Sequence, residues 1–147
     1  MKCDYFLDKV FCEFTVITHD EDCHIVTKET GIKPCRFFNK GDRFTSKYSP
    51  RIGRQPHGLW AIQSTPVISE ELDISRHIQY FQKLFEDKMD IIEKLKNQYH
   101  FECVFSIDIE TEDAGVGFDL NEAEVTFIQA ISSRYSCHFM TKEKIDR

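Results

Sequence analysis

The chain has 147 residues, of which 41 % are hydrophobic and 13 are phenylalanine, and its formal net charge at pH 7 is −6. This composition excludes a wholly disordered chain, and no run of about 18 apolar residues is present that could cross a membrane. Acidic residues near the start interrupt any secretory signal, and the negative charge argues against a protein that coats nucleic acids. We expect one cytoplasmic domain over residues 1–147, with its core at 10–140 and a polar tail at 141–147.

Cysteine spacing bears on the compartment and on metal binding. The six cysteines include no pair with the Cys-x-x-Cys spacing of zinc ribbons and redox sites. Two Cys-His pairs, at residues 23–24 and 137–138, are candidate metal ligands. Adjacent residues of a strand point to opposite faces, so each pair would offer a single ligand. We therefore expect reduced core thiols, no metal site and no cofactor.

The first half of the chain predicts three short strands and one short helix. β-Branched and aromatic residues predict the first strand, and Gly31 is a suitable stop for the helix. Glycines and prolines between the second and third strands predict a loop. The predicted elements are a strand at residues 10–18, a turn at 19–22, a helix at 23–30, a strand at 35–38, a loop at 39–58 and a strand at 59–64.

A long amphipathic helix is predicted over residues 73–99. Apolar residues recur there at steps of three and four, which places them on one face of a helix. Charged residues occupy the opposite positions, so we expect the apolar face to pack on a sheet. The residues of the apolar face are Ile74, Ile78, Phe81, Phe85, Met89, Ile92, Leu95 and Tyr99.

The rest of the chain predicts two strands, a third helix and a last strand. Residues 101–109 alternate between apolar and polar, as a strand with one buried face does. Residues 112–115 predict a hairpin turn into a returning strand at 116–120. Asn121 with Glu124 forms a variant of the capping box at the start of the helix. The helix has an inner stripe of Val125, Ile128, Ile131 and Tyr135, and the last strand is at 136–140.

This order, β-α-β-β-α-β-β-α-β, predicts an α+β fold with a ferredoxin-like plan. In such a fold the helices lie on one face of a mainly antiparallel sheet. A small sheet also leaves edge strands that can pair with a second copy. Residues 10–18 or 136–140 are candidates for that edge, so a homodimer or a higher homo-oligomer is one predicted state.

Three segments together resemble a bacterial family. They are GIKPCRFFNKGD at residues 31–42, GLWAIQ at 58–63 and GFDLNEAEVTFIQAI at 117–131. Gly-Ile-x-Pro followed by an aromatic residue and Lys-Gly-Asp looks like the domain-of-unknown-function family 4279, and the resemblance covers residues 10–140. It implies a small bacterial or phage α+β domain. It implies no activity, so no catalytic residue is carried over.

Positive charge is concentrated between Lys33 and Arg54. That stretch holds seven cations and one acid, a net charge of +6 (7 − 1), whereas the rest of the chain holds 12 cations and 24 acids. The charges could simply balance the acidic body, but arginine forks also bind phosphate or carboxylate, and aromatic faces stack on planar ligands. The predicted partner is a small anionic ligand or an acidic protein surface, not an extended nucleic acid. The candidate ligand-binding residues are Arg36, Lys40, Arg43, Phe44, Lys47, Tyr48, Arg51, Arg54, His57 and Trp60.

Catalytic patterns are weaker. Asp108, Glu110 and Glu112 occupy alternate strand positions, which is also the pattern of an exposed sheet face. Our leading hypothesis is a non-enzymatic protein that captures a phosphate-bearing, nucleotide-like ligand through its basic loop, for example to sequester a signal molecule. One alternative is an inhibitor of the immunity or anti-defence type that docks this loop on an acidic partner. Another is a small hydrolase that uses Asp108, Glu110 or His57.

Overall fold

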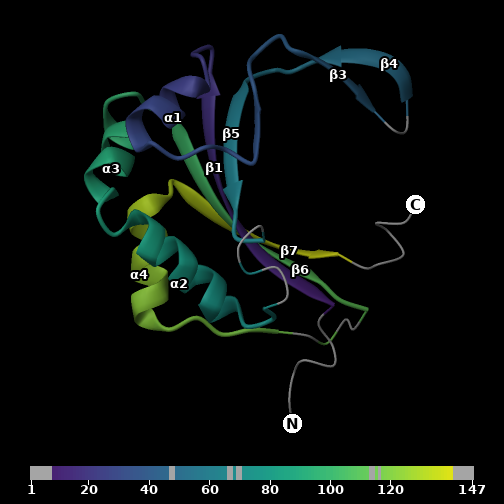
Figure 1. Cartoon of the computed structure of the whole chain (residues 1–147). Helices are drawn as coiled ribbons and strands as arrows, with labels where there is room; N and C mark the ends of the chain where they lie inside the picture. The colour runs from purple at the N-terminus through teal and green to yellow at the C-terminus, as the bar shows by residue number, and fades with distance from the viewer. Residues whose placement is uncertain are drawn as a thin grey trace.

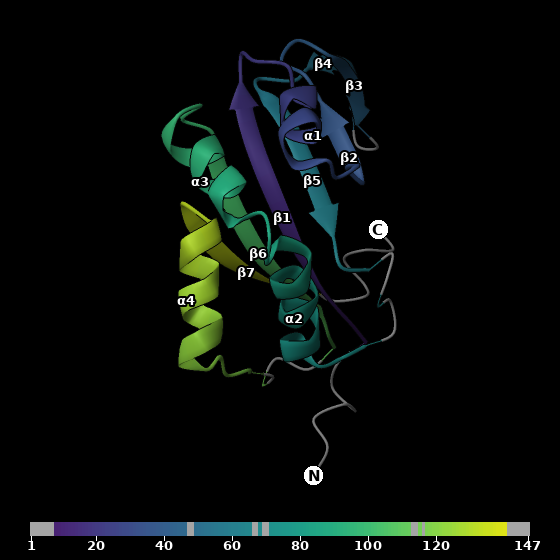
Figure 2. The ribbon, with the colours of Figure 1, turned by 60° about the vertical axis from the view of Figure 1, so that its left-hand side comes forward.

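A computed structural model describes residues 8–46, 49–65, 68, 71–112, 115 and 117–140. Within these residues, four helices cover one face of a five-stranded sheet, and a two-stranded ribbon projects beyond it (Figures 1 and 2). The strands are β1 (Lys9–His19), β2 (Arg36–Phe38), β3 (Arg43–Ser46), β4 (Ser49–Arg54), β5 (Gly58–Gln63), β6 (Glu102–Glu110) and β7 (Arg134–Met140). The helices are α1 (His24–Thr30), α2 (Ile74–Phe85), α3 (Met89–Asn97) and α4 (Glu122–Ile131). Among the described residues, no helix combines the length and the apolar character that crossing a membrane requires.

Strand β1 lies at the centre of the five-stranded sheet, whose order is β2-β5-β1-β6-β7. It pairs antiparallel with β5 and β6, and β2 pairs antiparallel with β5. These pairings confirm an α+β fold with a mainly antiparallel sheet, but the ferredoxin-like order is not confirmed. The prediction that residues 10–18 could form an edge is wrong, because β1 has a neighbour on each side.

The last strand joins the sheet in a different way from the one predicted. β7 runs parallel to β6, and α4 makes the crossover between them. The predicted return at 116–120 is wrong, because residues 117–120 are not in a strand and lead into α4. Phe118 and Leu120 pack against the core along this path. Parallel neighbours need such a crossover, which a tight hairpin cannot supply.

The helix predicted over residues 73–99 is in fact two helices, α2 and α3. The break falls at residues 86–88, where the N–H of Lys88 donates to the carbonyl of Phe85 over 2.9 Å. Helix α2 contacts β1, whereas α3 contacts α1 and α4. Because sheets twist, two short helices can each follow their own part of the core, which one straight helix of this length could not do.

A cluster of phenylalanines joins α2, β1 and β6. The ring centroids of Phe14 and Phe85 are 5.1 Å apart, and those of Phe81 and Phe105 are 5.5 Å apart, both pairs edge-on. All four side chains are buried. Edge-to-face contacts of this kind add to the free energy gained from burying the rings. The strand predicted at residues 101–109 is confirmed, and β6 turns its odd-numbered residues toward the helices, although Ser106 and Asp108 on the other face are also buried.

Two predicted helix boundaries are confirmed. Gly31 ends α1 in the left-handed conformation, with φ of 72°. Asn121 and Glu124 form a reciprocal capping box, in which each side chain accepts from the other residue's backbone N–H over 2.8 and 3.0 Å. Tyr135 was predicted on this last helix and lies instead in β7, because α4 ends at Ile131.

A buried polar chain holds the start of α2 to the sheet. The N–H of Cys12 donates to Ser64 Oγ over 3.0 Å, and Ser64 Oγ lies 2.6 Å from His77 Nδ1. His77 Nε2 lies 2.6 Å from the carbonyl oxygen of Glu71. A carbonyl oxygen only accepts, so His77 Nε2 carries a proton and donates it to Glu71. These hydrogen bonds tie β1, the end of β5 and the segment before α2 together.

A second polar link joins α1 to α3 through the carboxylate of Glu29. Tyr99 Oη donates to Oε1 over 2.8 Å, and Lys94 Nζ lies 3.0 Å from Oε2. The Tyr99 hydrogen bond, followed by the Lys94 contact, lowers the pKa of Glu29 below its ordinary value of 4.5. The same contacts raise the pKa of Tyr99 and of Lys94. The ionised form of Glu29 therefore favours the folded state.

Replacing Phe105 by alanine should remove buried contacts to Phe81 and leave a cavity. We expect Phe105→Ala to lower the free energy of unfolding by about 3–5 kcal/mol, measured by urea denaturation. Phe37→Ala is the matched control, because Phe37 is 53 % exposed, and it should cost less than about 1 kcal/mol. Equal losses in the two variants would contradict the assigned core.

Glu29 should make stability depend on pH in the acidic range. Its pKa is lower in the folded state, so its contribution is present above 4.5 and is lost as the pH falls below that value. We expect the melting temperature of the wild type to exceed that of Glu29→Gln at pH 7. The two values should converge as the pH falls toward 3, and a difference that does not change with pH would refute this role.

Candidate functional site

The ribbon of β3 and β4 is the centre of the predicted binding segment. The prediction of a loop at 39–58 is wrong in part, because β3 and β4 form an antiparallel pair there. At the base of the ribbon, the N–H of Gly41 donates to the carbonyl of Gln55, and the N–H of Gln55 donates to the carbonyl of Asp42, both over 2.8 Å. Both strands of an isolated ribbon are edges, which tolerate proline and glycine. We call the described part of this ribbon, residues 43–46 and 49–54, the arm, which extends away from the helices (Figure 1).

The arm has two different faces. The register pairs Arg43 with Arg54 and Thr45 with Ile52, so these four residues share one face. Phe44 lies on the other face, opposite Gly53. A Cβ atom at Gly53 would lie 2.5 Å from the Phe44 ring, so the ring covers the glycine directly. Arg43 and Arg54, which were predicted to act with Phe44 on one ligand, are therefore turned to the side of the arm opposite Phe44.

Like charges face each other across the arm. Arg43 and Arg54 are directly opposite cross-strand partners, an arrangement that destabilises an antiparallel pair. One guanidinium nitrogen of Arg54 donates to the carbonyl of Gly41 over 3.0 Å, which fixes this side chain near the base. An anionic group placed between the two guanidinium groups would remove the repulsion and accept hydrogen bonds from both.

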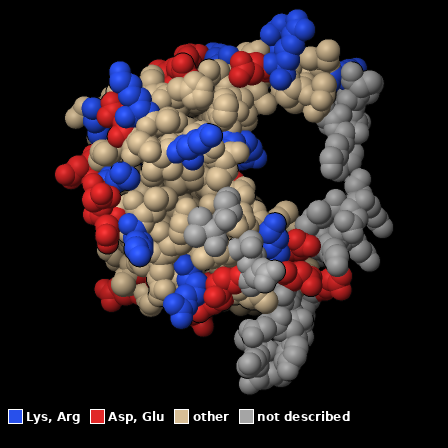
Figure 3. Space-filling view, in the orientation of Figure 1, with Lys and Arg blue, Asp and Glu red and all other residues tan. Residues whose placement is uncertain are grey.

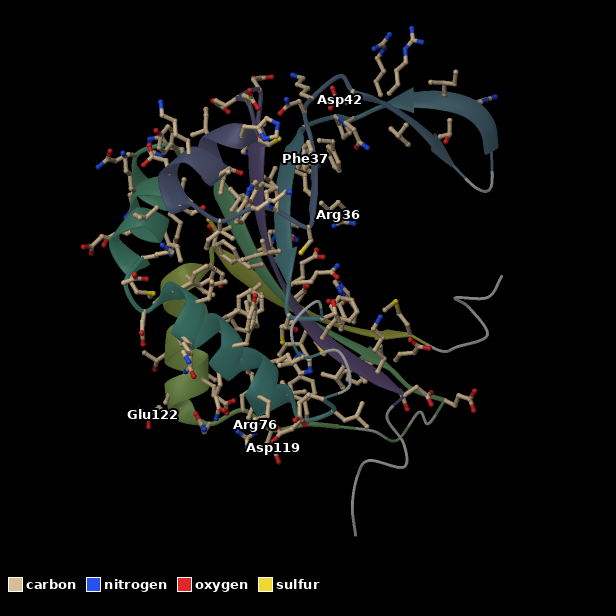
Figure 4. The ribbon with its side chains drawn as sticks, in the orientation of Figure 1. Arg36, Phe37, Asp42, Arg76, Asp119 and Glu122 are labelled. Atoms are coloured by element: carbon tan, nitrogen blue, oxygen red, sulfur yellow. The ribbon has the colours of Figure 1, made fainter. Side chains whose placement is uncertain are left out.

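Arg36 lies elsewhere, on the sheet face that the helices leave uncovered, which we call the open face. Its Nη2 atom is 3.1 Å from Glu13 Oε1. The Glu13 carboxylate also accepts from Gln63 over 2.6 Å and from Thr15 over 3.0 Å. Figure 4 shows Arg36 pointing into the hollow that the arm overhangs, and Figure 3 shows that hollow in outline. Glu13 already balances this charge, so Arg36 is not a bare anion site.

The remaining predicted residues are dispersed. Lys40 Nζ lies 2.5 Å from Asp20 Oδ1, and both side chains are exposed. His57 lies beside the ring of Phe38, with 6.2 Å between the ring centroids. Arg51 belongs to β4. Lys47 and Tyr48 lie outside the described residues.

Trp60 is fully buried and does not wall a site near the arm. It belongs to β5 and forms part of the core beneath the helices. Its indole N–H donates to the hydroxyl of Thr27 in α1 over 2.9 Å. The side chain thus links the sheet to α1. A ligand at the arm would therefore not contact Trp60.

The structure adds Ile52 to the arm. This side chain is 64 % exposed and shares its face with Arg43 and Arg54. The sequence predicts a loop here, so Ile52 is not among the predicted binding residues. The sequence does indicate it, because this isoleucine lies between arginines in a stretch without neighbouring core residues. Such a side chain has no apolar group to pack against and is expected to be exposed.

A carboxylate and a histidine meet at the other end of the open face. Asp108 Oδ1 lies 3.0 Å from His138 Nδ1, and Ser106 Oγ donates to Oδ2 over 3.0 Å. Asp108 is only 9 % exposed, in contrast to the predicted exposed sheet face. Asp108 pairs with Phe11 at one end of β1, whereas His57 lies beyond the other end, roughly 25 Å away along the strand. The residues of the predicted hydrolase are therefore not gathered in one place.

A compact group of potential metal ligands lies at the start of α1. The ligating atoms of Asp22, Cys23 and His24 are within 4.8 Å of one another. Asp22 Oδ1 already accepts from the N–H of His24 over 2.9 Å and from the side chain of Asn39 over 3.3 Å. Burial raises the pKa of the Cys23 thiol, which opposes formation of the thiolate that a metal needs. These contacts favour a structural turn.

Comparison with known proteins identifies a family but no activity. A model of the family described as Domain of unknown function (DUF4279) matches residues 8–139. The match spans all the strands and helices described above except the last residue of β7. No curated protein and no solved structure matches the chain.

The repulsion across the arm is open to a direct test. Arg43→Glu places a carboxylate opposite Arg54 and should stabilise the arm by about 0.2–1 kcal/mol. Hydrogen exchange at arm amides should therefore slow in the variant at low salt. Added salt screens charges, so it should slow exchange in the wild type and speed it in the variant. The same direction of salt response in both proteins would contradict the assigned pairing.

Proposed function

The chain belongs to the family described as Domain of unknown function (DUF4279), and we propose that it is a non-enzymatic protein that docks its arm on an acidic surface of a partner protein. The observation that carries this proposal is one face of the arm. Arg43 and Arg54 face each other there beside the exposed Ile52. Paired cations next to an exposed apolar side chain suit a protein surface that offers carboxylates around an apolar patch.

The distribution of charge supports an acidic partner. The stretch from Lys33 to Arg54 carries +6, while the remainder of the chain is strongly acidic. Figure 3 shows basic side chains on the arm, and both acidic and basic side chains over the body. An acidic partner would be attracted to the arm and repelled by much of the body. This asymmetry would speed encounter and orient the two molecules.

The shape of the arm favours a protein over a small ligand. Small-molecule sites are concave and bury most of the ligand. On the arm, Phe44 is turned away from the face of Arg43 and Arg54, and Trp60 lies in the core. A nucleotide held between the arginines would therefore lack a stacking wall among the described candidate residues. A partner protein needs only a projecting ribbon, and such docking would suit an inhibitor of the immunity or anti-defence type.

The test compares three anionic probes, two of which are polymers matched in length and charge. Fluorescence anisotropy would measure binding of poly-glutamate, of single-stranded DNA of equal length, and of ATP. Two charge-assisted contacts are worth about 1.5–3 kcal/mol each, so Arg43→Ala with Arg54→Ala should weaken poly-glutamate binding by about 100-fold or more. The control, Lys33→Ala with Lys83→Ala, makes the same charge change outside the arm and should weaken binding by less than about threefold.

Several outcomes would overturn the proposal. Equal losses in the two double variants would mean that the arm has no special role. Tighter binding to DNA would point to nucleic acid, and a melting temperature raised by ATP would restore the small-ligand hypothesis through linkage. A wild type that binds none of the probes would also count against it. The arm variant should keep the melting temperature of the wild type, because both arginines lie outside the core.

A further inference from the structure

The two edges of the five-stranded sheet differ in how well they are protected. At one edge, β2 has three residues and continues into the base of the arm. At the other edge, β7 has seven residues, RYSCHFM, with neither lysine nor proline. Short strands, lysine and proline are the usual devices that stop a sheet edge from pairing with another chain. Among the described strands, β7 has one neighbour, β6, and carries none of these devices.

The backbone of β7 turns alternate residues toward its outer side. The N–H of Thr111, which follows β6, donates to the carbonyl of Met140 over 2.9 Å. Met140 therefore turns its backbone groups toward β6, and the even-numbered residues of β7 share that direction. The N–H and C=O groups of Tyr135, Cys137 and Phe139 then point to the outer side, because successive residues of a strand alternate.

The side chains of these same residues form an apolar strip. Tyr135 is 56 % exposed and Phe139 is 52 % exposed. The Phe139 ring lies 6.4 Å from the ring of Phe118, which precedes α4. Tyr135 and Cys137 border a groove of about 350 Å³ between β7 and α4. The lining of this groove is mainly apolar and includes Phe105, Ile107, Phe118, Leu120 and Ile128.

We propose that a second copy of the chain pairs with this edge, β7 against β7 in antiparallel orientation, with a two-fold axis at Cys137. In that register Tyr135 of each copy lies opposite Phe139 of the other, so two aromatic pairs form on the helix side of the sheet. Ser136 lies opposite His138, and Arg134 lies opposite Met140, so no like charges meet. Tyr135, Cys137 and Phe139 of the two copies would exchange about six backbone hydrogen bonds.

The choice of a second copy rests on this self-complementarity. When two copies of β7 are centred on Cys137, Tyr135 of each copy faces Phe139 of the other, which gives two aromatic pairs. An unrelated partner would need the same spacing of aromatic residues. A two-fold pairing also closes, because it uses the same surface on both copies. The other edge, β2, is too short to extend the assembly, so the expected species is a dimer with a continuous ten-stranded sheet, from five strands in each copy.

Sedimentation equilibrium of the reduced, full-length protein tests the dimer. At about 100 µM the protein should have twice the 17.3 kDa mass of the chain. Phe139→Lys should raise the dissociation constant about tenfold or more, because it removes an aromatic pair and adds charge to the edge. The matched control is Phe37→Lys at the β2 edge, where the side chain is equally exposed, and it should remain dimeric. A monomeric wild type, a species larger than a dimer, or an equal loss in both variants would overturn the proposal.

Disulfide trapping tests the register without disturbing the edge. At a hydrogen-bonded antiparallel pair, the two Cα atoms lie about 5.5 Å apart, within the range of a disulfide. In Cys3→Ser with Cys35→Ser, diamide should take two protons and two electrons from the two Cys137 thiols and leave a covalent dimer. In Cys3→Ser with Cys137→Ser, which retains the exposed Cys35, no covalent dimer should form. Trapping through Cys35 and not through Cys137 would place the contact elsewhere and refute the register.

Discussion

The pairing of β1 with two antiparallel neighbours governs the rest of the molecule. Because β5 and β6 both bond to it, the side chains that β1 turns toward the helices, such as Phe14, become the floor of one continuous core. The helices can then cover only that face. No described helix covers the other face, and polar groups on it find partners within the sheet, as Glu13 does with Gln63 and Arg36. The separation into a covered and an open face thus follows from where one strand sits.

Charged side chains are arranged differently on the body and on the arm. The acidic body satisfies several of its cations locally, through pairs such as Lys94 with Glu29 and Lys40 with Asp20. On the arm, the register instead sets Arg43 against Arg54. A ribbon without a core of its own gains little from burial, so retaining repulsion there costs local stability without threatening the fold. Under the proposed function, relieving this repulsion on contact with an acidic partner would add to the free energy of docking.

Local signals in the sequence predicted local structure well and long-range geometry poorly. The Gly31 stop, the capping box of Asn121 with Glu124 and the buried alternation of β6 depend on nearby residues and were all predicted. The break between α2 and α3 falls in Glu-Asp-Lys, which contains neither glycine nor proline, so only the curvature of the sheet reveals it. The parallel pairing of β7 and the burial of Trp60 likewise depend on tertiary contacts. For the candidate site, the basic segment was predicted, but the opposite orientations of Phe44 and Arg43 depend on strand register.

The buried chain from Cys12 through Ser64 and His77 to Glu71 has a consequence for how the molecule comes apart. These hydrogen bonds link the N-terminal strands to α2 and to the segment that precedes it. Detaching α2 and α3 from the strands would break the hydrogen bond between His77 Nδ1 and Ser64 Oγ and leave that ring nitrogen without a described partner until water hydrates it. The two parts of the chain therefore form one cooperative unit. Partial opening is directed instead to the arm, which lies outside this network of hydrogen bonds.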